Sequence, residues 1–400
     1  MSQLQAGAAT VPLGVPDWPQ TTDGTPLMAR CLLLASEQTE VALLSISVLA
    51  LTIEDSTAVR VAVSSVTGLP PEQAMVACTH VHSGPPVLAD SPETRLALLP
   101  HICTASAAAA SGAQAQLRPA SLGHTADTLP GISRVRRIRR QNGTIITLRR
   151  AWPQWWGWAR DPETVGPEEP LDDLLTVVRV DDAAGDLLAA VVHFTCHPIP
   201  DFVGWAARIV EAQHPGASCL MLNGCLGTVD TPFEVPMRGL TQADQLPALG
   251  DILAYRALEL LVRTETRPEP AIAAISRPVF LPADPAFLAA PGDRAGLWPG
   301  AIAAGGFAAE VQTVLLGDLA LVGIPGEAHV GFGVEVERSS PFGLTRVVGL
   351  CNGEVGYLLL DSSRTRGGYE ADPAQWGVVT GEGVPRLLYA ARECLQHLSV

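Results

Sequence analysis

The stretch MVACTHVHSGPP (residues 75–86) joins an apolar run to two histidines and then to a Ser-Gly-Pro-Pro turn. The run predicts a buried strand over residues 74–79. Side chains two residues apart lie on one face of a strand, so His80 and His82 can reach a common point. Three interpretations follow: a metal site at a strand end, a catalytic pair involving Ser83, or an ordinary turn. The Ser83 interpretation is the weakest, because the stretch lacks the G-x-S-x-G elbow that exposes a nucleophilic hydroxyl, whereas Ser-Gly-Pro is common in turns.

Two further polar residues follow apolar runs in the same way. His197 closes AAVVHFTCH (189–197), and Glu327 follows LALVGIPG (319–326). Sites in α/β proteins are assembled at strand ends, where the sheet is rigid and the loops leave room for substrate. Two imidazoles and one carboxylate match the His₂Glu set of catalytic zinc. Their spacing is not the local H-E-x-x-H kind, so separately hydrogen-bonded histidines near strand ends remain the alternative.

Helical and strand-like patterns alternate along the whole chain. Helices are expected at 92–113, 201–213, 241–264 and 384–398. Strands are expected at 28–35, 41–52, 74–79, 174–180, 188–195, 218–222, 270–280, 312–323 and 345–350. This interleaving predicts an α/β (mixed α+β) fold in which mixed β-sheets are flanked by helices. No linker separates two composition regimes, so residues 1–400 are expected to form a single domain.

Composition narrows the class of protein. Hydrophobic residues make up 47% and charged residues 17% of the 400, which suits a buried core and argues against disorder. The formal net charge of −15, with no large basic cluster, argues against a nucleic-acid partner. The run RVRRIRR (134–140) is either an exposed strand of alternating arginines or a segment with one arginine facing an anion.

The usage of single residue types excludes further chemistries. All 26 basic residues are arginines, which rules out a Schiff-base lysine, a P-loop lysine and a Ser–Lys pair. The eight cysteines show no C-x-x-C spacing, which favours a reduced compartment. The N-terminus lacks a secretory signal, and the apolar run 41–53 is shorter than the roughly 20 residues of a spanning helix. We therefore expect a cytoplasmic protein without stable membrane insertion.

Several motifs resemble, in the same order, those of the neutral/alkaline ceramidases. They are PLMARCLLL (26–34), THVHSGP (79–85), HFTCHPIP (193–200), LNGCLGTVDTP (222–232), IPGEAHVGFG (324–333), GLCNGEVGYLLL (349–360) and GGYEAD (367–372). Each is short, but together they span most of the chain. The resemblance implies a single ceramidase-like catalytic domain over residues 1–400, with a metal site at strand ends and zinc-dependent amidase chemistry.

The resemblance also assigns site residues. The family's Zn²⁺ ligands fall on His80, His197, Glu327 and Tyr357. His82 then becomes a catalytic group beside the metal, which orients a ligand or the attacking water. Tyr357 carries no signal of its own, because a tyrosine at a strand end is common in packing.

Departures from the family change the expected mechanism. In the 222–232 loop the family's aspartate is Thr228 and its proposed catalytic serine is Asp230, so a serine mechanism cannot be carried over. Asp230 is expected to act as a general base or to bind a cationic substrate group, with capping of the loop backbone as the structural alternative. Arg134 is the position that matches the family's arginine and is expected to bind substrate, whereas the family's asparagine is Ser133.

The expected substrate also differs from ceramide. No counterpart of the family's C-terminal immunoglobulin-like domain follows the tyrosine motifs, and no apolar membrane-docking segment is found. We therefore expect hydrolysis of a C–N amide (or ester) bond in a small soluble molecule by metal-activated water. The alternatives are a non-catalytic metal- or ligand-binding protein of the same fold, a ceramidase-type lipid amidase, and a metal-dependent phosphoester hydrolase. The sequence does not indicate an oligomeric state.

Overall fold

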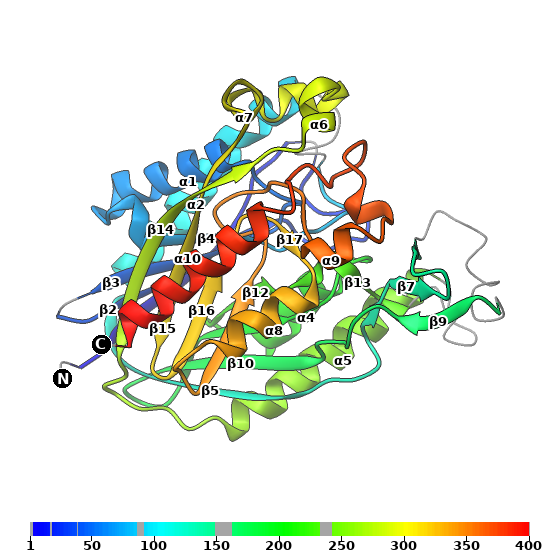
Figure 1. Ribbon diagram of the computed structural model, residues 1–400. Helices are drawn as coiled ribbons and strands as arrows, with labels where there is room; N and C mark the ends of the chain where they lie inside the picture. The colour runs from blue at the N-terminus through cyan, green and yellow to red at the C-terminus, as the bar shows by residue number, and fades with distance from the viewer. Residues whose placement is uncertain are drawn as a thin grey trace.

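Two β-sheets stack face to face between two layers of helices in the computed structural model (Figure 1). It describes residues 3–16, 18–37, 39–85, 92–148, 162–232 and 242–399. The larger sheet has the strand order β12 (Ser218–Asn223), β11 (Leu187–Phe194), β10 (Leu174–Asp182), β5 (Arg118–Thr128), β1 (Gln5–Pro12), β2 (Met28–Ala35), β3 (Glu40–Ile46) and β4 (Ala74–Cys78). The smaller sheet has the order β14 (Ile272–Pro282), β15 (Gly306–Leu316), β16 (Leu319–Gly323) and β18 (Leu344–Val348).

Both sheets are mixed. The pairs β3–β4, β11–β12 and β16–β18 are parallel, and the other pairs in the two sheets are antiparallel. Short ladders lie outside them: β6 (Arg134–Val135) with β13 (Val229–Asp230), β17 (Glu327–Ala328) with β19 (Tyr357–Leu358), and β8 (Ile145–Thr147), β7 (Arg137–Arg140) and β9 (Thr164–Pro167) together. The predicted mixed sheets flanked by helices are therefore confirmed.

Helices cover the outer face of each sheet. The larger sheet is covered by α1 (Ile53–Thr67), α2 (Pro92–Ala115), α4 (Phe202–Gln213) and α5 (Gln242–Arg263). The smaller sheet is covered by α8 (Val330–Arg338) and α10 (Gly383–Leu398), which Figure 1 shows lying across its strands. Shorter helices are α6 (Pro285–Ala289), α7 (Pro299–Ala304) and α9 (Asp361–Arg364).

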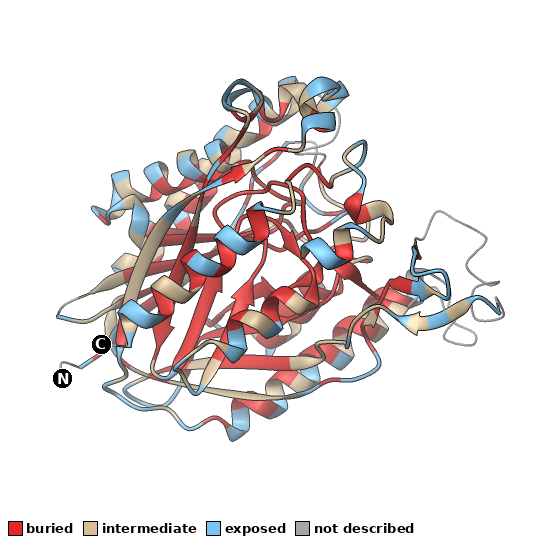
Figure 2. Cartoon of the chain, in the orientation of Figure 1, coloured by how far each residue is buried: buried red, intermediate tan, exposed pale blue. Residues whose placement is uncertain are grey.

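The core follows from the two-residue period of the strands. In β10, Val178 faces the smaller sheet, whereas Val177 packs against the α4–α5 layer. In β12, Leu222 and Met221 divide in the same way. Strands covered on both faces read as continuous apolar runs, which is why these segments carry few polar residues. Figure 2 shows most strands buried, while the helices expose their outer faces.

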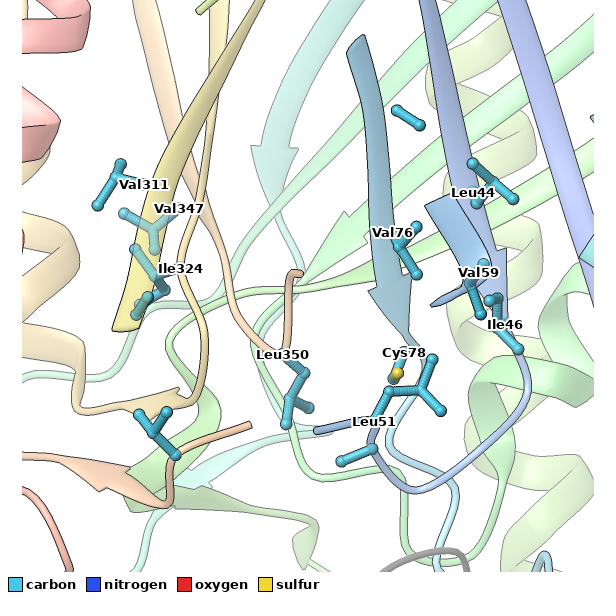
Figure 3. Packing of buried hydrophobic residues seen from close by; sticks show 14 of the residues in the cluster. Leu44, Ile46, Leu51, Val59, Val76, Cys78, Val311, Ile324, Val347 and Leu350 are labelled. Carbon is cyan, nitrogen blue, oxygen red and sulfur yellow. The ribbon is translucent and has the colours of Figure 1, made fainter. Parts of the chain in front are cut away.

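A short irregular segment, residues 349–352, fastens the two sheets together. Cys78 at the end of β4 donates its N–H to Leu350 O at 3.2 Å, and Leu350 donates its own to Gly326 O at 3.1 Å. Asn352 N–H reaches back to Val76 O at 2.8 Å. Figure 3 shows Leu350 between Cys78 and side chains of the smaller sheet such as Ile324. The strand ends of both sheets are therefore fixed relative to each other.

Several elements differ from the prediction. The expected strand 312–323 is a hairpin, because Gly317 adopts φ +70° in a turn between β15 and β16. The expected strand 41–52 ends at Ile46, and the chain then leads into α1, whose Thr52 side chain accepts the Asp55 N–H at 3.1 Å. The helix was missed because its many β-branched residues resemble a strand. The elements β1, β5 and α8 were also not predicted.

One described helix segment, Glu93–Ala115, is long and apolar enough to cross a membrane by length and composition. This segment is longer than the apolar run 41–53 that the sequence analysis compared with a membrane-spanning helix. In the structure this segment belongs to α2, which packs along α1 and against β1 and β2. The alanine-rich second half of α2 buries Ala109, Ala110 and Ala113 in the core. A core helix passes the same test of length and composition as a membrane span.

Candidate metal centre

The carboxyl ends of β4, β11, β12, β16 and β18 meet on one side of the core. Asn223 Nδ2 donates to Cys78 O at 3.0 Å, and Gly349 N–H donates to Asn223 O at 3.0 Å. A cavity of about 430 Å³ opens where these strands end. Its wall includes His80, His82, His197, Asp230, Glu327 and Tyr357. The cavity thus gathers six of the seven residues singled out from the sequence.

His80 and His197 are held by backbone carbonyls. His80 Nδ1 lies 2.8 Å from Leu49 O, and His197 Nδ1 lies 2.7 Å from Val229 O. A carbonyl oxygen only accepts, so each Nδ1 carries a hydrogen and each ring turns its Nε2 toward the cavity. His80 also adopts φ 62°, a left-handed conformation that is uncommon outside glycine. β4 ends at Cys78, so a turn, and not the predicted strand, directs this ring into the cavity.

Glu327 completes a set of three facing acceptors. Its Oε2 lies 3.1 Å from His197 Nε2 and 3.6 Å from His80 Nε2. This oxygen is buried and has no hydrogen-bond partner within the described part of the chain. Burial, helped by Arg136, lowers the pKa of His197. Burial alone would raise the pKa of Glu327, but the adjoining imidazoles hold it well below its ordinary value.

His82 lies beside this set. Its Nε2 is 3.2 Å from His80 Nε2, and the potential ligand atoms of His80, His82 and His197 lie within 4.8 Å of one another. The residue is open to the cavity, yet desolvation of its ring, followed by the two neighbouring imidazoles, lowers its pKa well below the ordinary value. His82 is therefore a neutral imidazole within reach of the same ion that the other two rings could hold.

Tyr357 reaches the cavity through the β17–β19 ladder. Its hydroxyl accepts a hydrogen bond from Arg136 Nη2 at 2.9 Å. Burial raises the pKa of the Tyr357 phenol well above its ordinary value, and the Arg136 guanidinium acts in the opposite direction. Arg136 is thus placed to favour a phenolate when a cation lies nearby.

Arg136 belongs to a buried network of charges. Glu370 accepts from Arg136 Nε at 2.8 Å, from Arg137 Nη1 at 2.9 Å and from Thr147 Oγ1 at 2.7 Å. Arg137 is also paired with Glu168 at 2.5 Å. Both arginines are buried, so the interpretation of 134–140 as an exposed strand was wrong for its central residues.

Asp230 and Arg134 differ in their position relative to the cavity. The two residues are register partners in the β13–β6 ladder, but only Asp230 lines the cavity. Asp230 Oδ1 accepts the Thr231 N–H at 2.8 Å, and Thr228 donates its hydroxyl to Glu169. The guanidinium in the cavity wall comes from Arg136, two residues after the predicted one.

Sequence reasoning missed Arg136 and a further buried acid, Glu354, which also lines the cavity. Arg136 could not be chosen over its neighbours, because every arginine in RVRRIRR satisfies the same pattern. Glu354 had a usable signal: a single carboxylate between glycines in the otherwise apolar motif GLCNGEVGYLLL. Glutamate is almost never fully buried unless it is paired, so an acid inside an apolar motif is informative.

A divalent cation fits the donors. Two neutral imidazole Nε2 atoms and one ionised carboxylate oxygen point at a common position, where three lone pairs repel one another unless a cation lies between them. The backbone carbonyls behind His80 and His197 are the outer partners that metal-binding histidines require. The set His80, His197 and Glu327, with Tyr357 adjacent, matches the ligand types of zinc.

The comparison with solved structures identifies the fold. A neutral ceramidase from Pseudomonas aeruginosa matches with a TM-score of 0.76 and 15% sequence identity, over 100% of this chain and 75% of that one. A ceramidase complexed with C2 matches with a TM-score of 0.75 and 16% identity, over 100% and 76%. This chain has the neutral ceramidase fold. The resemblance drawn from the sequence motifs is thereby confirmed at the level of the fold.

The ceramidase fold is the only point that these comparisons establish, since identities of 15% and 16% leave activity open. No protein-family model matches the chain, and no curated protein does either. Of the two positions in the 222–232 loop that depart from the family motif, Thr228 and Asp230, only Asp230 lies in the cavity wall. Function must therefore be argued from the site.

Proposed function

We propose that this protein is a zinc-dependent hydrolase that cleaves a C–N amide (or ester) bond in a small soluble substrate. One observation carries the proposal: Nε2 of His80, Nε2 of His197 and Oε2 of Glu327 converge on a cavity wall, and the Glu327 oxygen has no hydrogen-bond donor among the described residues. Structural zinc sites are closed by four protein ligands, whereas catalytic sites keep a position open toward substrate. The cavity supplies that opening.

His80, His197, Glu327 and Tyr357 would hold the ion. Zinc in such a site polarises a carbonyl and lowers the pKa of bound water toward about 7. Arg136 keeps the Tyr357 oxygen in place, and Glu370 keeps Arg136 in place. The protein's contribution is therefore a rigid, largely buried set of ligands with one accessible side.

Proton transfer falls to Asp230 and His82. Amide hydrolysis removes a proton from the attacking water and delivers one to the leaving nitrogen. Asp230 has Oδ1 occupied by the Thr231 N–H, which leaves Oδ2 to accept the proton. His82 Nε2, next to the His80 ring and open to the cavity, is placed to orient the water or to pass the proton on.

The cavity favours a small substrate. Its volume of about 430 Å³ lies toward the lower end of typical ligand sites, which run from about 300 to 1,000 Å³. Apolar and aromatic residues, including Leu49, Ile199 and Trp376, also line the cavity. An amide with a compact apolar or aromatic portion suits this lining better than a long lipid.

The test is hydrolysis of an amide and ester library by protein stripped with a chelator and then reloaded with zinc. Ceramide in detergent and simple phosphoesters are included, so that each alternative has its own substrate. Activity that is abolished by the chelator and restored by about one zinc per chain supports the proposal. Stoichiometric zinc without hydrolysis of any amide or ester would favour the binding-only alternative, and phosphoester cleavage would favour the phosphatase.

A further inference from the structure

Glu354, which follows β18, is the third carboxylic acid among the described residues of the cavity wall, after Asp230 and Glu327, and has no role in the mechanism above. It is 2% exposed. Its Oε1 accepts a hydrogen bond from the Gly356 N–H. Its Oε2 is buried and has no hydrogen-bond partner within the residues that the structure describes. A buried polar atom left without a partner is rare in a folded protein and calls for a physical explanation.

The backbone around Glu354 is tightly held. Gly353 has φ +152°, and a Cβ there would lie 2.6 Å from Ile53 Cγ1. Gly356 has φ +84°, and a Cβ there would lie 2.1 Å from the Trp376 carbonyl oxygen. The Trp298 indole donates to the Glu354 carbonyl at 3.1 Å. The unpartnered carboxyl oxygen therefore sits on a rigid backbone, as a preorganised binding group does.

Among the described residues, no cationic side chain of the cavity wall is paired with Glu354. Among the described lining residues Arg136 is the one guanidinium, and it is engaged with Glu370, the Gly227 carbonyl and Tyr357. Burial raises the pKa of Glu354 well above its ordinary value, and the nearby Glu327 raises it further.

A buried carboxyl group with no cation beside it is far less costly to the fold when it is neutral. Because Oε1 of Glu354 already accepts the Gly356 N–H, the proton belongs on Oε2. The cavity wall thus presents one neutral O–H donor without an acceptor.

We propose that Glu354 is a specificity-determining residue that donates a hydrogen bond from Oε2 to an uncharged oxygen of the substrate beside the scissile amide. The inference rests on the proposed function for the identity of the scissile bond. A hydroxyl or carbonyl oxygen accepts a hydrogen bond from this donor. An apolar group leaves the donor unpaired, and an ammonium group places a second donor against it. Sites built around a polar substrate group reject analogues that lack it.

Three anilides test this preference, because they differ at one position only. Glycolanilide carries a hydroxyl beside the amide carbonyl, propionanilide a methyl and glycinanilide an ammonium group. Dissociation constants are measured by ligand-observed NMR on the zinc-loaded protein, and aniline release is measured separately. The variants are Glu354→Met, which removes the donor at similar length, and Glu354→Gln. Glu259→Met, at an exposed position, is the control for a Glu→Met change as such.

We expect the unaltered protein to bind glycolanilide at least about tenfold more tightly than either analogue. Glu354→Met should bring the ratio close to one. Glu354→Gln should restore the preference, since its amide oxygen can accept the Gly356 N–H while its NH₂ donates to the substrate. Equal binding of the three probes, binding of none, a preference for glycinanilide or no rescue by Gln would each overturn the role of Glu354.

The two proposals fail in different ways. A hydroxyl preference in a protein that hydrolyses no member of the amide and ester library at any zinc loading would overturn the hydrolase and leave the binding role of Glu354 standing. Aniline release without any hydroxyl preference would do the reverse. Each dissociation-constant ratio is taken on one protein preparation, so partial unfolding or incomplete zinc loading of a variant does not alter it.

Discussion

Glu327 and Tyr357 are register partners in the parallel ladder between β17 and β19. Thirty residues of chain separate them, and the ladder brings a carboxylate and a phenol to the same cavity wall. Glu327 N–H also donates to Gly356 O at 3.1 Å, which fixes the start of the ladder. The proposed ligands come from four separated segments and are held by backbone hydrogen bonds, so their geometry depends little on flexible side chains.

Removing a member of the facing set should remove the metal. Because His80 and Glu327 each present a ligand-type atom to the same point of the cavity, His80→Ala and Glu327→Ala should each weaken zinc affinity by about a hundredfold or more. Zinc content after dialysis, measured by elemental analysis, checks this. His101→Ala on α2 is the matched control and should keep its zinc. A full zinc content in His80→Ala would show that the ion is bound by other ligands.

Breaking the buried charge network should cost stability as well as activity. Glu370→Ala leaves Arg136 and Arg137 as buried charges with a lost partner, which typically costs about 3–5 kcal/mol. Urea unfolding monitored by tryptophan fluorescence measures the loss. Glu259→Ala, which breaks an exposed pair with Arg256, should not shift the midpoint measurably. Similar midpoints for the two variants would contradict the claim that Glu370 stabilises the fold by pairing with Arg136 and Arg137.

The convergence of His80, His197 and Glu327 could be anticipated because each follows an apolar strand. Carboxyl ends of parallel strands meet at one edge, so the order of apolar run, ligand-type residue and Gly or Pro was informative. The stacking of two sheets was not predictable from it, since inward- and helix-facing residues are equally apolar in strands buried on both faces.

The remaining site residues depend on irregular backbone. His80 enters the cavity through a left-handed turn after β4. The sequence predicted that His80 faces a shared site, but it did so by extending the strand to residue 79. Tyr357 and Glu354 lie in a segment shaped by Gly353 and Gly356, where no period of 2 or 3.6 applies. Tyr357 could be predicted as a site residue only from the family motif. Glu354 lies within a motif of the sequence analysis but was not considered as a site residue. The contacts that select Arg136 exist only in the folded protein.

A buried acid at the start of α4 should make stability depend on pH. Asp201 caps the helix by accepting the Gly204 N–H at 3.0 Å, and burial raises its pKa from 3.8 to about 6. Between about pH 4 and pH 6 the folded protein keeps a proton at Asp201 that the unfolded chain has released. The free energy of unfolding therefore falls as pH rises through this window, by about 3 kcal/mol from this residue.

Asp201→Asn tests this dependence, because asparagine caps helices about as well as aspartate and does not ionise. Denaturant unfolding at pH 4 and pH 7 should show a smaller difference between the two pH values in the variant, with the gain at pH 7. Asp182→Asn is the control, since Asp182 accepts the Ala184 N–H at 2.9 Å in an exposed turn. An unchanged pH dependence in Asp201→Asn would mean that Asp201 is ionised in the folded protein across the whole range.

Asp230 distinguishes proton transfer from loop capping. Asp230→Asn retains an oxygen that can accept the Thr231 N–H, so the loop should keep its shape and the protein its zinc. The variant cannot take a proton, and loss of a general base typically lowers the rate by about 10²–10⁴. We therefore expect kcat/KM for the best amide substrate to fall by that factor, with zinc content and unfolding midpoint unchanged. Asp230→Ala, which removes the cap as well, should lower both activity and stability. If Asp230→Asn hydrolyses the amide at nearly the original rate while Asp230→Ala unfolds more easily, then Asp230 only caps the loop, and His82 would have to accept the proton from the attacking water.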